Sequence, residues 1–162
     1  MSYDTNREAV VRSFLAEAGL NTARREPLPG DASTRRYERL HLPGGGKLML
    51  MDAPPTAEPP PLGPRATVEE RRAAGYNAMA RLSAGRVDAF AACAGWLRAQ
   101  GLSAPEVIKC DPRQGLAILE DLGEGLFTKQ IAAGADEQEL YFTAVEALAR
   151  LHAVEPPELL RG

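Results

Sequence analysis

The most informative part of the sequence is a short polar loop, Pro29-Gly30-Asp31-Ala32-Ser33-Thr34-Arg35-Arg36-Tyr37, which joins predicted strands over residues 24–28 and 35–42. Its glycine and small residues would let backbone N–H groups approach an anion closely. Arg35 and Arg36, just beyond the loop, could pair with phosphate oxygens through their planar guanidinium groups. The loop therefore predicts a phosphate-binding site, and a plain β-hairpin with polar turn residues is the alternative. No Gly-Lys-Ser/Thr sequence is present, so this is not a Walker loop.

Three further segments have the composition of strands: residues 47–51, 106–110 and 116–119. Residues 43–46 can only form a turn, so the first three strands of the chain are predicted to form an antiparallel meander. A second turn over residues 111–115 leads into 116–119, whose apolar run predicts a buried strand.

Helical periodicity occurs before, between and after these strands. Three boxes of the Ser/Thr/Asp-x-x-Glu kind predict where helices begin. The predicted helices start at Thr5, Thr67 and Asp136, and two others cover residues 87–100 and 127–133.

The segment Glu120-Asp121-Leu122-Gly123 separates the buried strand from the next helix. Peptide groups at such a break could hydrogen-bond a planar base, and a simple strand-to-helix turn is the alternative. The Asp-Leu-Gly sequence also invites comparison with the metal-binding Asp-x-Gly of kinases. That interpretation is rejected, because the segment comes too early and no catalytic loop precedes it.

Composition restricts the class of protein. The chain has 162 residues, 44% of them apolar, and a formal charge of −3, as expected of one soluble domain or a small domain with an appendage. There is no basic excess of the kind that nucleic-acid binding favours, and no run of about 18 apolar residues, so neither nucleic acid nor a membrane is expected as a partner. Two cysteines, Cys93 and Cys110, are too few for a zinc site or a disulfide scaffold. The sequence predicts a cytoplasmic protein with reduced thiols.

Five segments occur in the order seen in one known superfamily. They are Gly30–Tyr37, Leu50–Pro55, Leu102–Val107, Leu119–Gly123 and Leu148–His152. With them the chain resembles the N-terminal half of the aminoglycoside phosphotransferase/choline kinase superfamily. Within it, the chain is most similar to bacterial cell-wall-recycling sugar kinases, which phosphorylate N-acetylmuramate and N-acetylglucosamine at the anomeric carbon.

The resemblance implies an α+β fold, namely the N-terminal lobe of a protein-kinase-like enzyme with a five-stranded antiparallel sheet and one main helix. Residues 1–119 would form this lobe, with a proline-rich insertion over about 54–86. Residues 120–162 would form the hinge and the first helices of a truncated C-lobe.

The resemblance also implies ATP with Mg²⁺ as the cofactor and assigns a nucleotide site. The loop residues Gly30, Asp31, Ala32 and Ser33 would cover the phosphates, with Arg35 and Arg36 beside them. The hinge residues Glu120, Asp121, Leu122 and Gly123 would offer backbone groups to adenine.

Two departures from the superfamily matter. A kinase-like third strand usually carries a lysine that pairs with phosphate, but here Lys47 only begins the strand, so phosphate pairing would fall to Arg35 or Arg36. The superfamily's catalytic His-Gly-Asp loop and its metal-binding aspartate follow the Leu-His helix. Only ten residues follow His152, and none is an aspartate. No catalytic and no metal-binding residue is therefore assigned, and the chain alone is predicted to be inactive.

The first functional hypothesis is the nucleotide-binding part of an ATP-dependent phosphotransferase that acts on an amino sugar in peptidoglycan recycling, shortened by truncation or gene splitting. The alternative is a non-catalytic binding module, or one half of a two-chain kinase whose partner is a C-lobe polypeptide. An aminoglycoside, choline or homoserine is the alternative substrate. His152 is predicted to be a packed core histidine, and the proline-rich insertion is hypothesised to be a surface lid over the nucleotide.

Overall fold

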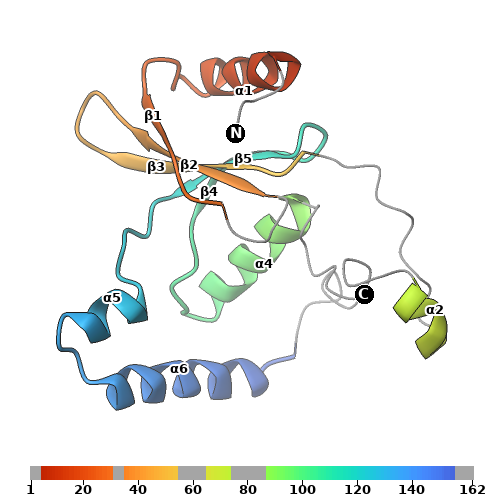
Figure 1. The fold of residues 1–162 in the computed structure, drawn as a ribbon, viewed down its shortest axis with the longest axis vertical. Coiled ribbons are helices and arrows are strands. Elements are labelled where there is room, and N and C mark those ends of the chain that lie inside the picture. The colour runs from red at the N-terminus through yellow and green to blue at the C-terminus, as the bar shows by residue number, and fades with distance from the viewer. Residues whose placement is uncertain (1–4, 31–34, 55–64, 74–86, 156–162) are drawn as a thin grey trace.

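The computed structural model describes residues 5–30, 35–54, 65–73 and 87–155 (Figure 1). Helices and strands follow one another in the order that the sequence predicts. The elements are α1 (Thr5–Glu17), β1 (Arg24–Pro27), β2 (Arg36–His41), β3 (Lys47–Asp52), α2 (Val68–Ala73), α4 (Val87–Ala99), β4 (Val107–Asp111), β5 (Leu116–Glu120), α5 (Phe127–Ala132) and α6 (Glu137–His152).

The five strands form one antiparallel sheet in the order β1-β2-β3-β5-β4. The meander predicted for the first three strands is confirmed, and β5 joins its open edge. The register places Tyr37 opposite Met51 and Met51 opposite Ala117. At the other end of the strands, His41 lies opposite Lys47, and Leu48 lies opposite Glu120.

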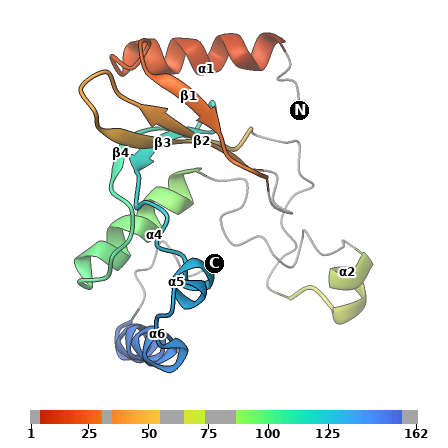
Figure 2. The same ribbon diagram turned by 60° about the vertical axis from the view of Figure 1, so that its left-hand side comes forward.

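Side chains alternate between the two faces of the sheet, because successive residues of a strand point in opposite directions. We call the face covered by α1 the outer face and the opposite one, against which α4 packs, the inner face. Figures 1 and 2 show α1 on one side of the sheet and α4 on the other. The outer core contains Val11, Phe14, Leu15, Leu40, Leu50, Leu116 and Ile118, and the inner core contains Met51, Ala53, Val87, Ala117 and Leu119.

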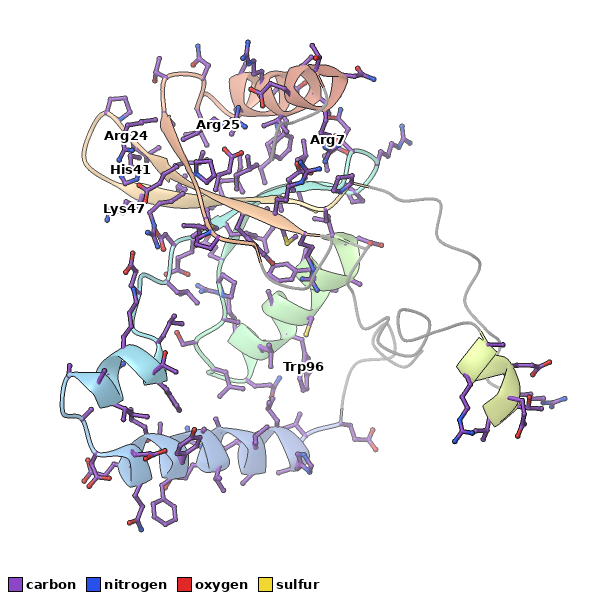
Figure 3. The ribbon with its side chains drawn as sticks, in the orientation of Figure 1. Arg7, Arg24, Arg25, His41, Lys47 and Trp96 are labelled. Carbon is purple, nitrogen blue, oxygen red and sulfur yellow. The ribbon has the colours of Figure 1, made fainter. Side chains whose placement is uncertain are left out.

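Two partly buried arginines, Arg7 and Arg25, fix α1 to the outer face (Figure 3). Arg7 donates to Asp52 Oδ1 from Nε at 3.0 Å and from Nη2 at 2.6 Å, and the Asp52 side chain is only 1% exposed. Arg25 of β1 pairs with Glu38 of β2 at 2.6 Å and with Glu8 of α1 at 2.6 Å. These contacts join residues far apart in the sequence, so they align the helix on the sheet.

The last two helices are arranged differently from the rest. Asp136 caps α6 as predicted, since its Oδ1 accepts from the backbone N–H groups of Gln138 at 2.8 Å and Glu139 at 3.1 Å. The rings of Phe127 in α5 and Tyr141 in α6 meet edge to face at 6.0 Å. Neither helix contains a buried residue.

One prediction about α6 is wrong. His152 is exposed and not packed in a core. Its apolar neighbours Val145 and Leu148 are also exposed, by 58% and 56%. An apolar stripe predicts a buried face, but Tyr141, Val145 and Leu148 stay more than half exposed, although the Phe127 ring contacts Tyr141.

Some predictions fall partly outside the described residues. Of the proline-rich insertion over about 54–86, only Pro54 and residues 65–73 are described. The capping box of α2 is confirmed, because Glu70 N donates to Thr67 Oγ1 at 3.2 Å and Thr67 N donates to Glu70 Oε2 at 2.7 Å. The lid hypothesis lies on residues that the structure does not describe.

Candidate functional site

The polar loop joins β1 and β2 at one end of the sheet. Leu28 N donates to Tyr37 O at 2.9 Å, which continues the β1–β2 pairing beyond β1. Gly30 lies at the start of the loop, and no atom lies within 4 Å of the position that a Cβ would occupy there. Asp31, Ala32 and Ser33 lie outside the described residues.

The two arginines after the loop occupy different positions. Arg36 is the first residue of β2 and pairs in register with Asp52. Alternation along β2 therefore places Arg36 on the outer face, with Glu38 and Leu40. Arg35 lies one residue before the strand and is partly buried. Of these two arginines, only Arg35 is therefore available to the loop end of the inner face.

The predicted hinge, residues 120–123, follows β5 at the other end of the sheet. The side chain of its first residue, Glu120, already has hydrogen-bond donors within the protein. Glu120 Oε2 accepts from Glu106 N at 3.0 Å and from Arg98 Nη1 at 3.2 Å. The same Arg98 atom donates to Ala104 O at 2.9 Å. Glu120 therefore connects the end of α4 and the start of β4 to the hinge.

Asp121 is held by an arginine from β2. Arg39 Nε donates to Asp121 Oδ2 at 2.7 Å, and the two side chains are 8% and 4% exposed. Burial raises the pKa of the Asp121 carboxyl, but hydrogen bonds from Arg39 and from Gly123 N together lower it below its ordinary value of 3.8. Asp121 is therefore a permanently charged anchor at neutral pH.

The backbone of the hinge lacks hydrogen-bond partners at Leu122 in the described part of the chain. Gly123 adopts φ +80°, a left-handed conformation that favours glycine, and its N–H donates to Asp121 Oδ1 at 2.9 Å. In the described part of the chain, the peptide N–H and C=O of Leu122 have no hydrogen-bond partner, and the residue is 53% exposed. Leu122 therefore has one unpaired peptide donor and one unpaired peptide acceptor among the described residues.

Apolar side chains occupy the inner face between the loop end and the hinge end, where Met51 and Leu119 are buried and Tyr37 and Met49 are partly buried. Tyr37, Met49, Met51 and Leu119 belong to this inner cluster or pack against it. Tyr37 Oη donates to Met51 Sδ at 3.5 Å, which fixes the ring beside the sheet. A flat aromatic base fits a surface of this kind, because apolar and sulfur-containing side chains contact π faces favourably.

No lysine of β3 lies inside this surface, as the sequence predicts. Lys47 is exposed at the hinge end of β3, five residues from the loop end of the same strand. Figure 3 shows Lys47 close to His41 and Arg24 at one corner of the sheet. This lysine is therefore badly placed to pair with phosphates at the loop.

The described residues do not provide a metal site. Residues 5–30, 35–54, 65–73 and 87–155 contain no group of three or more His, Cys, Asp or Glu side chains that could hold a metal ion. The two cysteines, Cys93 and Cys110, are free thiols.

A hollow of about 540 Å³ lies on the outer face between α1 and β1. Its charged lining residues include Glu8, Arg12 and Arg25, and both arginines pair with Glu8. The hollow belongs to the face opposite the predicted site and contains none of the predicted site residues.

Two residues near the predicted nucleotide site, Arg39 and Tyr37, were not identified as site residues from the sequence. Arg39 is a single arginine inside a strand, and only the pairing of β2 with β3 and of β3 with β5 shows that it reaches the hinge. Tyr37 was quoted as part of the loop motif, but its place on the inner surface depends on strand register.

The chain belongs to the phosphotransferase enzyme family, whose model matches residues 24–161. The match begins at β1, so α1 lies before it. By its definition a phosphotransferase moves a phosphoryl group from a donor to an acceptor. The five-stranded antiparallel sheet with its helices agrees with the kinase-like N-terminal lobe that the sequence predicts.

A relative from Caulobacter vibrioides is named N-acetylmuramate/N-acetylglucosamine kinase. It is 54% identical to this chain over 161 residues, which cover 99% of the chain but 44% of the relative. The chain thus spans less than half the length of that relative. Among the described residues, no helix is long and apolar enough to cross a membrane.

Proposed function

We propose that this chain is the nucleotide-binding part of an ATP-dependent phosphotransferase that acts on an amino sugar. The observation that supports it best is the hinge. Leu122, three residues after the inner-face residue Leu119, has an unpaired peptide donor and acceptor, and the chain belongs to a family of phosphotransferases.

Each part of the inner face would contact a different part of the nucleotide. The peptide N–H and C=O of Leu122 would pair with the edge of adenine, which offers both an acceptor and a donor. Met49, which is only partly buried, would contact the face of the base. Gly30, Asp31, Ala32 and Ser33 would approach the phosphates with backbone N–H groups, and Arg35 would neutralise their charge.

The steps after binding need groups that the described residues do not supply. Phosphoryl transfer requires a positioned metal and a group that orients the attacking hydroxyl. Since the described carboxylates form no metal-binding cluster, we assign no metal-dependent step to this region. The division that we propose is a lobe over residues 1–119, and a hinge with the start of a second lobe over residues 120–162.

The hinge assignment is tested by removing one backbone donor. Leu122→Pro deletes the peptide N–H, whereas Leu122→Ala keeps it and removes only the exposed side chain. Titration calorimetry with ADP is expected to give weak binding for the original chain, little change for Leu122→Ala, and a loss of about tenfold for Leu122→Pro. Circular dichroism checks that both variants stay folded. Equal affinities for the two variants would contradict the hinge assignment, and no binding by the original chain would contradict the proposed function.

The amino-sugar substrate is supported by the name of the Caulobacter relative, which is 54% identical. Because the chain covers 44% of that relative, we expect no turnover of N-acetylmuramate or N-acetylglucosamine by the chain alone. Turnover detected with the pure chain and Mg-ATP would show that the chain is a complete enzyme. An aminoglycoside, choline or homoserine remains the alternative acceptor, and a cytoplasmic location remains a prediction.

A second candidate function is one half of a two-chain kinase, and one surface of the molecule favours it. We define the helical-pair surface by six apolar residues of α5, α6 and the turn before them, which are 37–60% exposed: Leu126, Phe127, Tyr141, Phe142, Val145 and Leu148. Exposed apolar patches of this kind mark interaction sites. The occupant we propose is a C-lobe polypeptide like the 56% of the relative that this chain does not cover.

Sedimentation velocity tests this occupant. The chain is expected to self-associate alone and to form a one-to-one complex when the C-terminal part of the Caulobacter relative is added. Phe142→Ser should weaken both forms of association. A clean monomer that ignores the added polypeptide would contradict the two-chain function.

A further inference from the structure

Arg39 is a buried cation on the inner face of the sheet, in the middle of β2. It lies opposite Glu26 of β1 and Met49 of β3 in the register. A buried charge is costly unless it is paired and hydrogen-bonded. Its partners therefore indicate what it does for the fold.

The partners of Arg39 both lie in the hinge region, more than 80 positions away in the sequence. Nε donates to Asp121 Oδ2 at 2.7 Å, and Nη1 donates to Glu124 Oε1 at 2.9 Å. Only the first pair is shielded from water, since the Asp121 side chain is 4% exposed and that of Glu124 is 58% exposed. Glu124 also pairs with Lys129 of α5.

The same carboxylate of Asp121 holds the turn. One oxygen accepts from Arg39, and the other accepts from Gly123 N at 2.9 Å. Arg39, Asp121 and Gly123 thus form one continuous chain of hydrogen bonds from the sheet to the hinge. Leu122, whose peptide groups are unpaired, lies between Asp121 and Gly123, the two residues that the hydrogen bond from Gly123 N joins.

We infer that Arg39 is a positioning residue, which fixes the peptide groups of Leu122 so that they can receive the edge of a purine base. This inference rests on the proposed nucleotide-binding function. Arg39 itself need not touch the base, because it acts through Asp121 and the Gly123 amide. Its planar fork matters, since a lysine would keep the charge but would lose the geometry that serves two carboxylates.

The chain offers a matched control on the opposite face of the sheet. Arg25 also pairs with two carboxylates, those of Glu38 and Glu8, but both lie on the α1 side. Arg25→Lys should lower the free energy of unfolding about as much as Arg39→Lys does. It should leave the hydrogen bonds of the hinge unchanged. Glu124→Gln removes only the exposed partner of Arg39.

The experiment measures two quantities on the full chain. Amide hydrogen exchange in peptides covering residues 120–126 is expected to be roughly tenfold faster in Arg39→Lys, and unchanged in Arg25→Lys and Glu124→Gln. ADP affinity by calorimetry should fall about tenfold in Arg39→Lys, while the affinity for inorganic tripolyphosphate stays the same. A merely structural role would weaken both ligands equally.

The possible outcomes separate this inference from the proposed function. Unchanged hinge exchange in Arg39→Lys, or ADP affinity equal to that of Arg25→Lys, overturns the positioning role. Equal losses for ADP and tripolyphosphate overturn it as well, because the effect would not be specific to the base. If the original chain binds no ADP, the proposed function fails and the base-positioning role fails with it. Hinge exchange then shows separately whether Arg39 holds the turn.

Discussion

Two regions of the molecule differ in how much apolar side chain they bury. One is the sheet with α1 and α4, and the other is the helical pair α5–α6. The buried apolar residues of the described chain lie between Val11 and Leu119. α6 is the longest described helix, with 16 residues, yet it buries none of them. Figure 2 shows the two helices set apart from the sheet, beyond α4. The sheet with α1 and α4 has two buried apolar clusters, whereas the helices α5 and α6 contain no buried residue.

The largest expected effect comes from the outer core. Leu50→Ala should lower the free energy of unfolding by about 2–5 kcal/mol, because Leu50 is fully buried against α1 and its loss leaves a cavity. The matched change in the helical pair, Leu148→Ala, should cost no more than about 0.5 kcal/mol. Urea denaturation followed by circular dichroism measures both, and similar losses would mean that α6 is buried in solution.

The buried ion pair under α1 should come next. Arg7→Met is expected to cost about 3 kcal/mol, because it leaves the Asp52 carboxylate buried without its charged partner. The double variant Arg7→Met/Asp52→Leu should recover most of that loss. Arg12→Met is the control, since Arg12 is 75% exposed and its pair with Glu8 should be worth less than about 1 kcal/mol. A double variant as unstable as the single one would argue against the pair as the cause.

The ion pair between sheet and hinge should have a defined pH dependence. The pKa of Asp121 is lowered in the fold, so its contribution is complete above the ordinary value of 3.8 and is lost as pH falls through the lower folded value. The difference in unfolding free energy between the original chain and Asp121→Asn should therefore be constant from pH 7 to about pH 5. It should shrink below 3.8. Urea titrations at several pH values measure this difference, and a constant difference down to pH 2 would exclude the linkage.

The smallest effect is expected at the cap of α6. Asp136→Ala removes the acceptor for two backbone N–H groups and should cost the helix about 1 kcal/mol. Because α6 buries no residue, this loss should stay local. Hydrogen exchange should rise within residues 137–152 while the urea midpoint of the sheet stays unchanged. A shift of that midpoint would show that α6 unfolds together with the sheet.

The fold was largely predictable from local signals. Turns at residues 43–46 and 111–115, three capping boxes and the apolar run 116–119 are short-range features, and the structure places strands and helices accordingly. The candidate site was predictable only in part. The hinge could be found as a break between a strand and a helix, but the different positions of Arg35 and Arg36 depend on strand alternation and register.

The sequence alone determined the elements of this protein and their order, because caps, turns and apolar periodicity act over a few residues. Only the tertiary structure decided which side chains meet across the sheet. Arg39 reaches Asp121 because β2, β3 and β5 are neighbours, and Asp52 faces Arg7 because α1 covers the outer face. It also decided that the apolar stripe of α6 is exposed, since burial depends on what packs against a face and not on the face itself.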